Sequence, residues 1–158
     1  MKNISPCLWF DNQAEEAAEF YVSLFPNSRI KQVNRYTDAG PGREGDVMVV
    51  VFELNGQEHV ALNGGPLFHF NEAVSLQIHC QGQAEVDLYW DALTKNGGTE
   101  SRCGWLKDKY GLSWQVTPVE VLEMIQDSDP AKAARAMKAM MPMAKLDIAK
   151  MKQAFDGG

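Results

Sequence analysis

The spacing of hydrophobic residues changes along the chain, and each spacing predicts a different kind of element. Residues 4–10 are mostly apolar and partly aromatic, as expected of a buried strand. Over residues 14–25 the apolar positions recur every three or four residues, which predicts a helix that ends before Pro26. Asn12 is the expected N-cap of this helix, with Glu15 as its capping-box partner. The apolar stripe of the helix must pack on a sheet.

Three further strands complete the first half of the chain. Residues 29–37 are expected to form a solvated strand, and a loop rich in glycine and proline follows at residues 38–46. Residues 47–54 form a run dominated by β-branched side chains. Asn55-Gly56 is typical of a tight turn between paired strands, so residues 57–63 are predicted to return beside that run.

The second half of the chain repeats this order of elements. A strand is expected at residues 74–80 and a helix at residues 84–96, which ends at a pair of glycines. Three short strands separated by glycines follow between residues 99 and 117. Placing Phe20-Tyr21 over Tyr89-Trp90 superimposes the two halves. The repeat indicates an α+β fold made of tandem βαβββ modules.

The two modules span residues 1–66 and 74–118, and we expect them to form one domain over residues 1–118. Residues 119–158 differ, because three helices are expected there. This helical C-terminal extension is rich in alanine and methionine. Methionine side chains fill irregular gaps, so the apolar surface of the extension is interpreted as core packing, a dimer contact or a lid over a substrate.

Composition narrows the classes of function. Fifteen basic against 21 acidic residues give a net charge of −6 and a pI near 5.0, the wrong sign for binding nucleic acid. The longest apolar run, residues 47–52, is far shorter than the roughly 20 residues of a membrane-spanning helix, and the N-terminus has no signal-peptide pattern. Three widely spaced cysteines are typical of free thiols in a reducing compartment. We therefore expect a cytoplasmic protein with neither a nucleic-acid nor a membrane partner.

Two patterns that often bind cofactors have a different interpretation here. Residues 40–45 match the GxGxxG fingerprint of dinucleotide-binding proteins, but they precede a strand, whereas the fingerprint opens a helix. We interpret them as a flexible hairpin loop. His59, His69 and His79 are isolated in sequence, and His79 and Cys80 point to opposite faces of their strand. No metal and no cofactor is therefore expected.

The candidate site comes from alternation along two strands of the second half. Polar residues occupy every second position of residues 74–80 and of residues 112–117, so each strand has one polar face. These positions are Ser75, Gln77, His79, Ser113, Gln115 and Thr117. Because Trp9, Trp105 and Trp114 cluster with such strands, the polar face is interpreted as the lining of a small-molecule pocket.

Several segments of the chain resemble the sequences of one known protein family. They are residues 4–10, 15–17, 20–21, 61–65, 103–118 and 129–155, and the most specific is the run from Gly104 to Pro118. On these segments the chain resembles the vicinal oxygen chelate superfamily, which includes glyoxalase I, bleomycin-resistance proteins and extradiol dioxygenases. It is similar to the PhnB-like branch, whose members are often labelled 3-demethylubiquinone-9 3-methyltransferase-like.

The resemblance implies a cup-shaped mixed sheet in each module, two modules that face each other around one pocket, and a homodimer. Metal-dependent members hold a divalent ion through the first and last strand of each module. Carried over by position, these ligands fall at Pro6, at Leu62 or Asn63, at Ser75 and at Gln115. None is His, Asp or Glu, the residues that a dication normally needs. The methyl transfer in the branch label finds no support in the residues, because no glycine-rich turn enters a helix.

Our leading hypothesis is a metal-free protein that binds a small, partly apolar organic molecule in the cup. The expected binding residues are Asn63, Ser75, Gln77, His79, Trp105, Ser113 and Gln115. In the first strand, the residues that face the cup are either Leu8 and Phe10 or Cys7 and Trp9. An alternative is a metal-dependent lyase, isomerase or transferase with a shifted ligand set that includes His79 and His59. A third hypothesis is an accessory protein that works through its methionine-rich tail.

Overall fold

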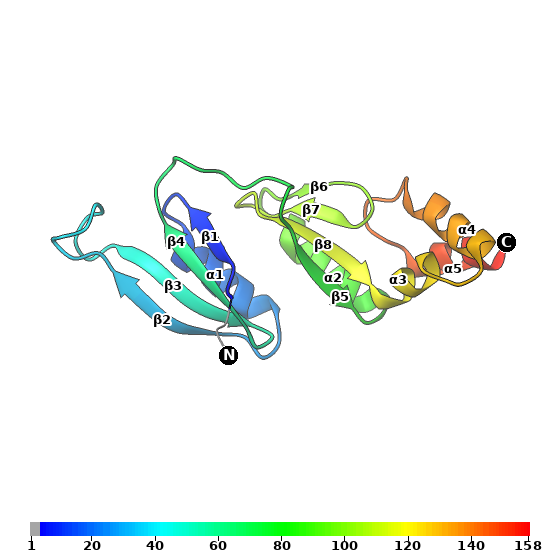
Figure 1. The fold of residues 1–158 in the computed structure, drawn as a ribbon, viewed down its shortest axis with the longest axis horizontal. Helices are drawn as coiled ribbons and strands as arrows, with labels where there is room; N and C mark the ends of the chain where they lie inside the picture. The colour runs from blue at the N-terminus through cyan, green and yellow to red at the C-terminus, as the bar shows by residue number, and fades with distance from the viewer. Residues whose placement is uncertain (1–3) are drawn as a thin grey trace. The chain divides into compact units, whose positions relative to one another are not determined.

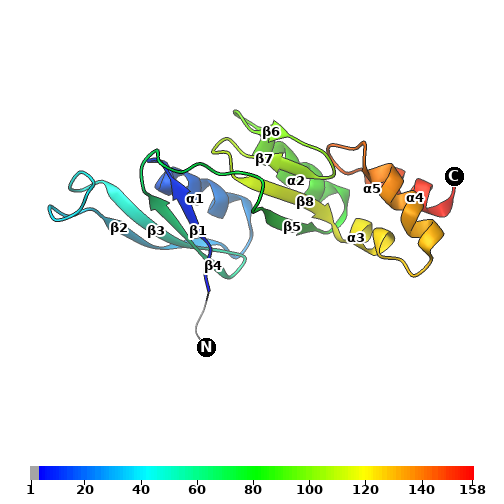
Figure 2. The ribbon, with the colours of Figure 1, turned by 45° about the horizontal axis from the view of Figure 1, so that its top comes forward.

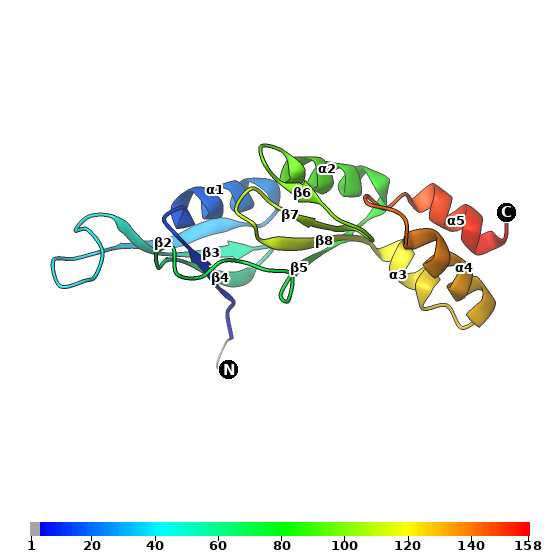
Figure 3. The ribbon, with the colours of Figure 1, turned by 90° about the horizontal axis from the view of Figure 1, so that it is seen from above.

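The structure is a computed structural model that describes residues 4–158, and these form two compact units divided between Phe70 and Asn71. Each unit contains one four-stranded sheet with a helix along one of its faces (Figures 1 and 3). No helix of residues 4–158 combines the length and the apolar character that crossing a membrane requires.

The first unit has the predicted order of strand, helix and three strands. Its elements are β1 (Cys7–Phe10), α1 (Ala14–Leu24), β2 (Arg29–Arg35), β3 (Val47–Leu54) and β4 (Gln57–Asn63). The strands lie in the order β1-β4-β3-β2, with β1 parallel to β4 and the other neighbours antiparallel. Asn55-Gly56 forms the tight turn, and both residues have the positive φ, 47° and 83°, that such a turn requires.

The second unit repeats this topology, which confirms the predicted α+β fold of two βαβββ modules. Its elements are β5 (Leu76–Cys80), α2 (Gly82–Thr94), β6 (Thr99–Glu100), β7 (Trp105–Lys107) and β8 (Ser113–Pro118). The strand order is β5-β8-β7-β6, again with only the first pair parallel. The two sheets therefore offer equivalent backbone positions to different side chains.

The core of the first unit lies between α1 and its sheet, and it resolves the orientation of the first strand. The predicted apolar stripe is fully buried along α1, but its last position, Phe25, lies beyond the helix and is only half-buried. Leu8 and Phe10 are buried as well, and Leu8 pairs with the fully buried Ala61 of β4. Because successive side chains of a strand point to opposite faces, Cys7 and Trp9 lie on the open face, the face that α1 does not cover.

A buried carboxylate organises the turn between β7 and β8 in the second unit. Asp108 accepts hydrogen bonds from the backbone N–H of Tyr110 at 2.9 Å and of Leu112 at 3.1 Å. It also accepts a bond of 2.8 Å from Nε1 of Trp114. The carboxylate thus holds the turn in a defined position at the start of β8.

The C-terminal extension forms the three predicted helices, α3 (Val119–Ile125), α4 (Pro130–Met140) and α5 (Ile148–Asp156) (Figure 2). Asp129 caps α4, because its side chain accepts bonds from the N–H groups of Ala131 and Lys132. A separate hydrophobic cluster holds the helices together. Its buried members are Val121, Ala136, Leu146 and Met151, with Met124, Met140 and Met143 packed against them. Part of the methionine-rich surface is therefore core.

Candidate functional site on the second sheet

The strand register brings the predicted polar residues of the second half together on one face. Gln77 of β5 lies opposite Gln115 of β8, and Gln115 lies opposite Trp105 of β7. The three side chains thus form a row across three neighbouring strands. His79 lies opposite Thr117 in the next row. Because the alternate residues of β8 are buried on the α2 side, this row belongs to the open face of the second sheet.

Hydrogen bonds within the open face fix its two amides. Nε2 of Gln115 donates to Oγ of Ser75 at 2.8 Å, and Nε2 of Gln77 donates to Oγ1 of Thr117 at 3.4 Å. Each bond uses one N–H of the amide, which leaves a carbonyl oxygen and a second N–H for a further partner. The exposed His79 adds one more polar group beside them. The face is preorganised for hydrogen bonding.

A cavity of about 290 Å³ adjoins this face at the β6 and β7 side of the sheet. Trp105, Lys107 and Ser113 line it. Nζ of Lys107 forms an ion pair of 2.7 Å with Glu72, and the hydrogen bond from Lys107 lowers the pKa of the Glu72 carboxyl. Neither Lys107 nor Glu72 was predicted from the sequence. Lys107 lies two positions after Trp105 on β7, so the two side chains point to the same face of the sheet.

Asn63, the predicted binding residue of the first unit, is bonded to the fold. Its Oδ1 accepts a bond of 2.8 Å from the N–H of Ala14, and its Nδ2 donates to the carbonyl of Val47 at 3.0 Å. The expected cap is wrong: Gln13 occupies the N-cap position and supplies no side-chain cap bond. Asn63 takes this function from the end of β4, because it satisfies the first N–H of α1. A ligand contact by Asn63 stays a prediction.

His59 lies in the core of the first unit, although the alternative hypothesis assigns it to a metal. Its ring stacks on Phe52 with centroids 5.4 Å apart, and its Nδ1 lies 2.9 Å from the carbonyl oxygen of Gln57. Burial lowers the pKa of His59, which favours the neutral ring. Within residues 4–158 no three His, Cys, Asp or Glu side chains are grouped as a metal site would require.

The positions that the resemblance assigns to a divalent ion do not fit such an ion. Pro6 and Leu62 have no side-chain donor atom, and Oδ1 of Asn63 is bonded to α1. Ser75 and Gln115 offer only neutral oxygens, which are weak ligands without a carboxylate or imidazole beside them. We therefore derive no chemical step through a metal at these positions.

Two four-stranded βαβββ sheets of this topology define a glyoxalase-like protein. Over residues 2–117 the chain matches the family model described as 3-demethylubiquinone-9 3-methyltransferase. It is also similar to the structure of a putative 3-demethylubiquinone-9 3-methyltransferase, PhnB protein, from Bacillus cereus. The identity is 38%, the match covers 75% of this chain and 100% of that chain, and the TM-score is 0.69. The chain belongs to this family, as the resemblance to the PhnB-like branch of the vicinal oxygen chelate superfamily predicted.

Two further solved structures are similar at lower identity. Protein PA1353 from Pseudomonas aeruginosa is 19% identical over 75% of this chain and 98% of that chain, with a TM-score of 0.62, and shares the fold. A glyoxalase-related enzyme from Fulvimarina pelagi is 13% identical over 77% of this chain and 91% of that chain, with a TM-score of 0.48. The comparison with curated proteins gave no match.

Proposed function

We propose that the open face of the second sheet binds a small organic molecule through hydrogen bonds and an aromatic contact, without a bound metal. The observation that carries this proposal is the row of Trp105, Gln115 and Gln77 on three neighbouring strands. An aromatic surface next to two oriented amides is typical of small-molecule sites, which combine apolar lining with a few placed polar groups.

The charge of this face indicates the class of ligand. Gln77, Gln115 and Thr117 are neutral, and the charge of Lys107 is matched by Glu72 at 2.7 Å. A charged ligand would lose its hydration without gaining an opposite charge, which costs free energy. A neutral molecule that has carbonyl or hydroxyl groups on an apolar frame matches the amides and the indole.

Methyl transfer, the reaction in the description of the family and of the Bacillus cereus relative, is not part of this proposal. A nucleotide-type methyl donor is commonly held by a glycine-rich turn that enters a helix. The glycine-rich loop of this chain enters strand β3 instead. The proposal therefore concerns binding.

The test is a nitrogen-15 NMR titration of the full chain with benzamide, phenol and 2-methoxyphenol, which are neutral aromatic probes. The side-chain amide signals of Gln77 and Gln115 report contact directly. We expect Gln115→Leu to weaken binding about fivefold, because one hydrogen bond contributes about 1 kcal/mol. The exposed Gln153→Leu on α5 is the matched control and should change nothing. A chelator should leave the affinity unchanged.

Two outcomes would contradict the proposal. If none of the probes shifts the two amide signals, the face is not a binding site for this class of molecule. If Gln115→Leu and Gln153→Leu bind the probes equally well, the ligand lies elsewhere. Binding that disappears with a chelator would favour the metal-dependent alternative.

A further inference from the structure

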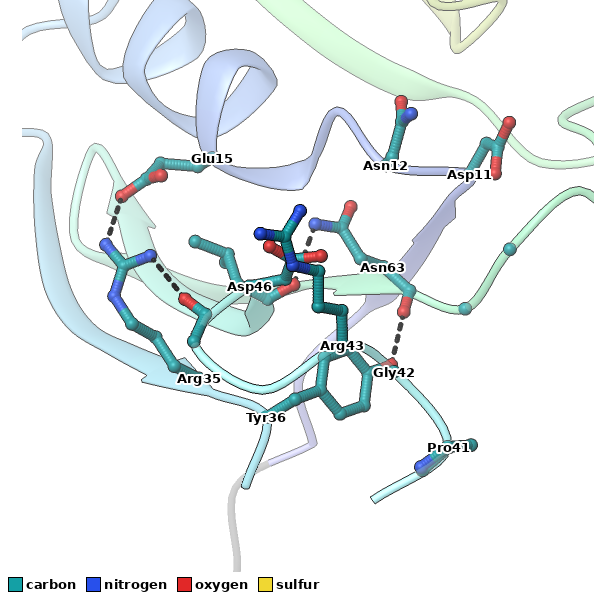
Figure 4. Close-up of a pocket in the computed structure, with 14 residues that line it drawn as sticks. Asp11, Asn12, Glu15, Arg35, Tyr36, Pro41, Gly42, Arg43, Asp46 and Asn63 are labelled. Atoms are coloured by element: carbon teal, nitrogen blue, oxygen red, sulfur yellow. Dashed lines mark hydrogen bonds and ion pairs between the residues drawn. The ribbon is translucent and has the colours of Figure 1, made fainter. Parts of the chain in front are cut away.

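The first unit contains a cavity of about 620 Å³ that the proposed function does not use. The first turn of α1, the loop between β2 and β3, and the end of β4 surround it (Figure 4). Its lining includes two arginines, Arg35 and Arg43, and three acidic residues, Asp11, Glu15 and Asp46. Cavities of roughly 300–1,000 Å³ suit small organic ligands.

Hydrogen bonds and close packing hold the walls of this cavity. The hydroxyl of Tyr36 donates to the carbonyl of Asn63 at 2.8 Å. Gly42 lies flat against the Tyr36 ring, where a Cβ would come within 2.4 Å of ring carbons. Nε1 of Trp9 donates to the carbonyl of Gly65 at 2.8 Å. Gly40 and Gly42 of the GxGxxG-like segment thus pack the loop onto Tyr36, which positions the next residue, Arg43.

Within residues 4–158, Arg43 and two of the acidic residues of the cavity, Asp11 and Asp46, belong to no ion pair. Arg35 is neutralised, because its guanidinium lies 3.6 Å from Glu15 and donates to the carbonyl of Gly45 at 3.2 Å. The backbone N–H of Asp46 donates to the carbonyl of Arg43 at 3.1 Å, so one turn fixes both residues.

The directions of the side chains place these two charges at the cavity. In Figure 4, Arg43 extends from its loop toward the side formed by Asp46 and Asn63, whereas Asp11 and Asn12 point away from it. A guanidinium binds a carboxylate through two parallel hydrogen bonds, and a carboxylate such as that of Asp46 binds an ammonium group.

We propose that this cavity binds a small zwitterion, a molecule with one carboxylate and one protonated amine, of the size of an amino acid or a dipeptide. Arg43 holds the carboxylate and Asp46 holds the ammonium group. A doubly charged phosphate fits less well, because the unpaired carboxylate of Asp46 would repel it. A divalent cation fits less well for the opposite reason, since Arg43 lies at the same cavity.

The test uses L-alanyl-L-alanine and L-phenylalanine as probes, titrated into the full chain and followed by nitrogen-15 NMR. We expect backbone shifts confined to residues 35–47 and 63–65. Arg43→Gln and Asp46→Asn should each weaken binding at least tenfold. Arg102→Gln, an exposed arginine of the second unit, is the control and should bind like the parent. Unchanged signals outside the loop show that each variant is folded.

Blocked dipeptides assign the two charges. N-acetyl-L-alanyl-L-alanine lacks the ammonium group, so Asp46→Asn should not weaken its binding, while Arg43→Gln should. L-alanyl-L-alanine amide lacks the carboxylate and should show the reverse pattern. The proposal is overturned if neither probe shifts the loop signals, or if Arg43→Gln and Arg102→Gln bind the probes alike. It is also overturned if the blocked dipeptides bind as tightly as the free one.

Discussion

Replacement of Asn63 by alanine should destabilise the first unit, because one amide connects three of its elements. The lost bond to the N–H of Ala14 corresponds to a helix cap, which contributes about 0.5–2 kcal/mol. The lost bond to the carbonyl of Val47 contributes about 0.5–1.5 kcal/mol. We therefore expect the free energy of unfolding to fall by about 2 kcal/mol. Asn63→Asp keeps the acceptor for Ala14 and loses the donor to Val47, so about half of that loss is expected.

Urea unfolding followed by circular dichroism measures this change. With an m-value of about 1 kcal/mol/M for a unit of this size, the midpoint of Asn63→Ala should drop by about 2 M. Hydrogen exchange of the α1 amides is the local readout, and it should accelerate in the same variant. Asn12→Ala is the matched control, because Asn12 is exposed and outside the cap, and its effect should stay within about 0.5 kcal/mol. Equal midpoints for Asn63→Ala and Asn12→Ala would refute the assignment of the cap.

Two other groups give predictions on stability. Asp108→Ala should cost the second unit about 3 kcal/mol or more in a urea titration, because it leaves the N–H groups of Tyr110 and Leu112 and the buried Trp114 indole without their acceptor. A loss below about 1 kcal/mol would contradict this. Burial, with Glu85 and Glu120 nearby, raises the pKa of Cys80 to about 12. The unfolded thiol ionises near pH 8.5, so the stabilisation is complete below that pH and is lost as the pH rises toward 12. Stability measured from pH 8 to 11 should fall more steeply in the parent than in Cys80→Ala, and identical slopes would count against the buried thiol.

The fold could be predicted because its signals are local and repeated. The helical spacing of apolar residues in α1 and the alternation of polar and apolar residues in β8 can each be recognised within one short segment. The second half of the chain then repeats the order of elements of the first half. The open face of the second sheet was predictable for the same reason, since strand parity alone groups Gln77 with His79 and Ser113 with Gln115. The polar residues of β5 and β8 come together because these two strands pair, as β1 and β4 do in the first unit.

The parts that could not be predicted depend on contacts between distant segments. Asn12 has the side chain of a cap, yet the bond to Ala14 comes from Asn63, which is 49 positions away. Nothing in the local sequence of Asn63 indicates that β4 ends beside α1. The cavity around Arg43 was missed for a different reason, because the GxGxxG-like segment was interpreted only as a flexible loop. Gly40 and Gly42 in fact pack on the ring of Tyr36, which directly follows β2.

The repeated fold also explains why family membership does not decide the chemistry. On the open face of the first sheet, Cys7 pairs with Val60 and Trp9 pairs with Leu62. The equivalent pairs of the second sheet are Gln77 with Gln115 and His79 with Thr117. The backbone positions are the same, but one face is mostly apolar and the other forms hydrogen bonds. Since two copies of one fold within a single chain differ this much, a ligand has to be inferred from the side chains at these pairs, and the shared fold supplies only the positions.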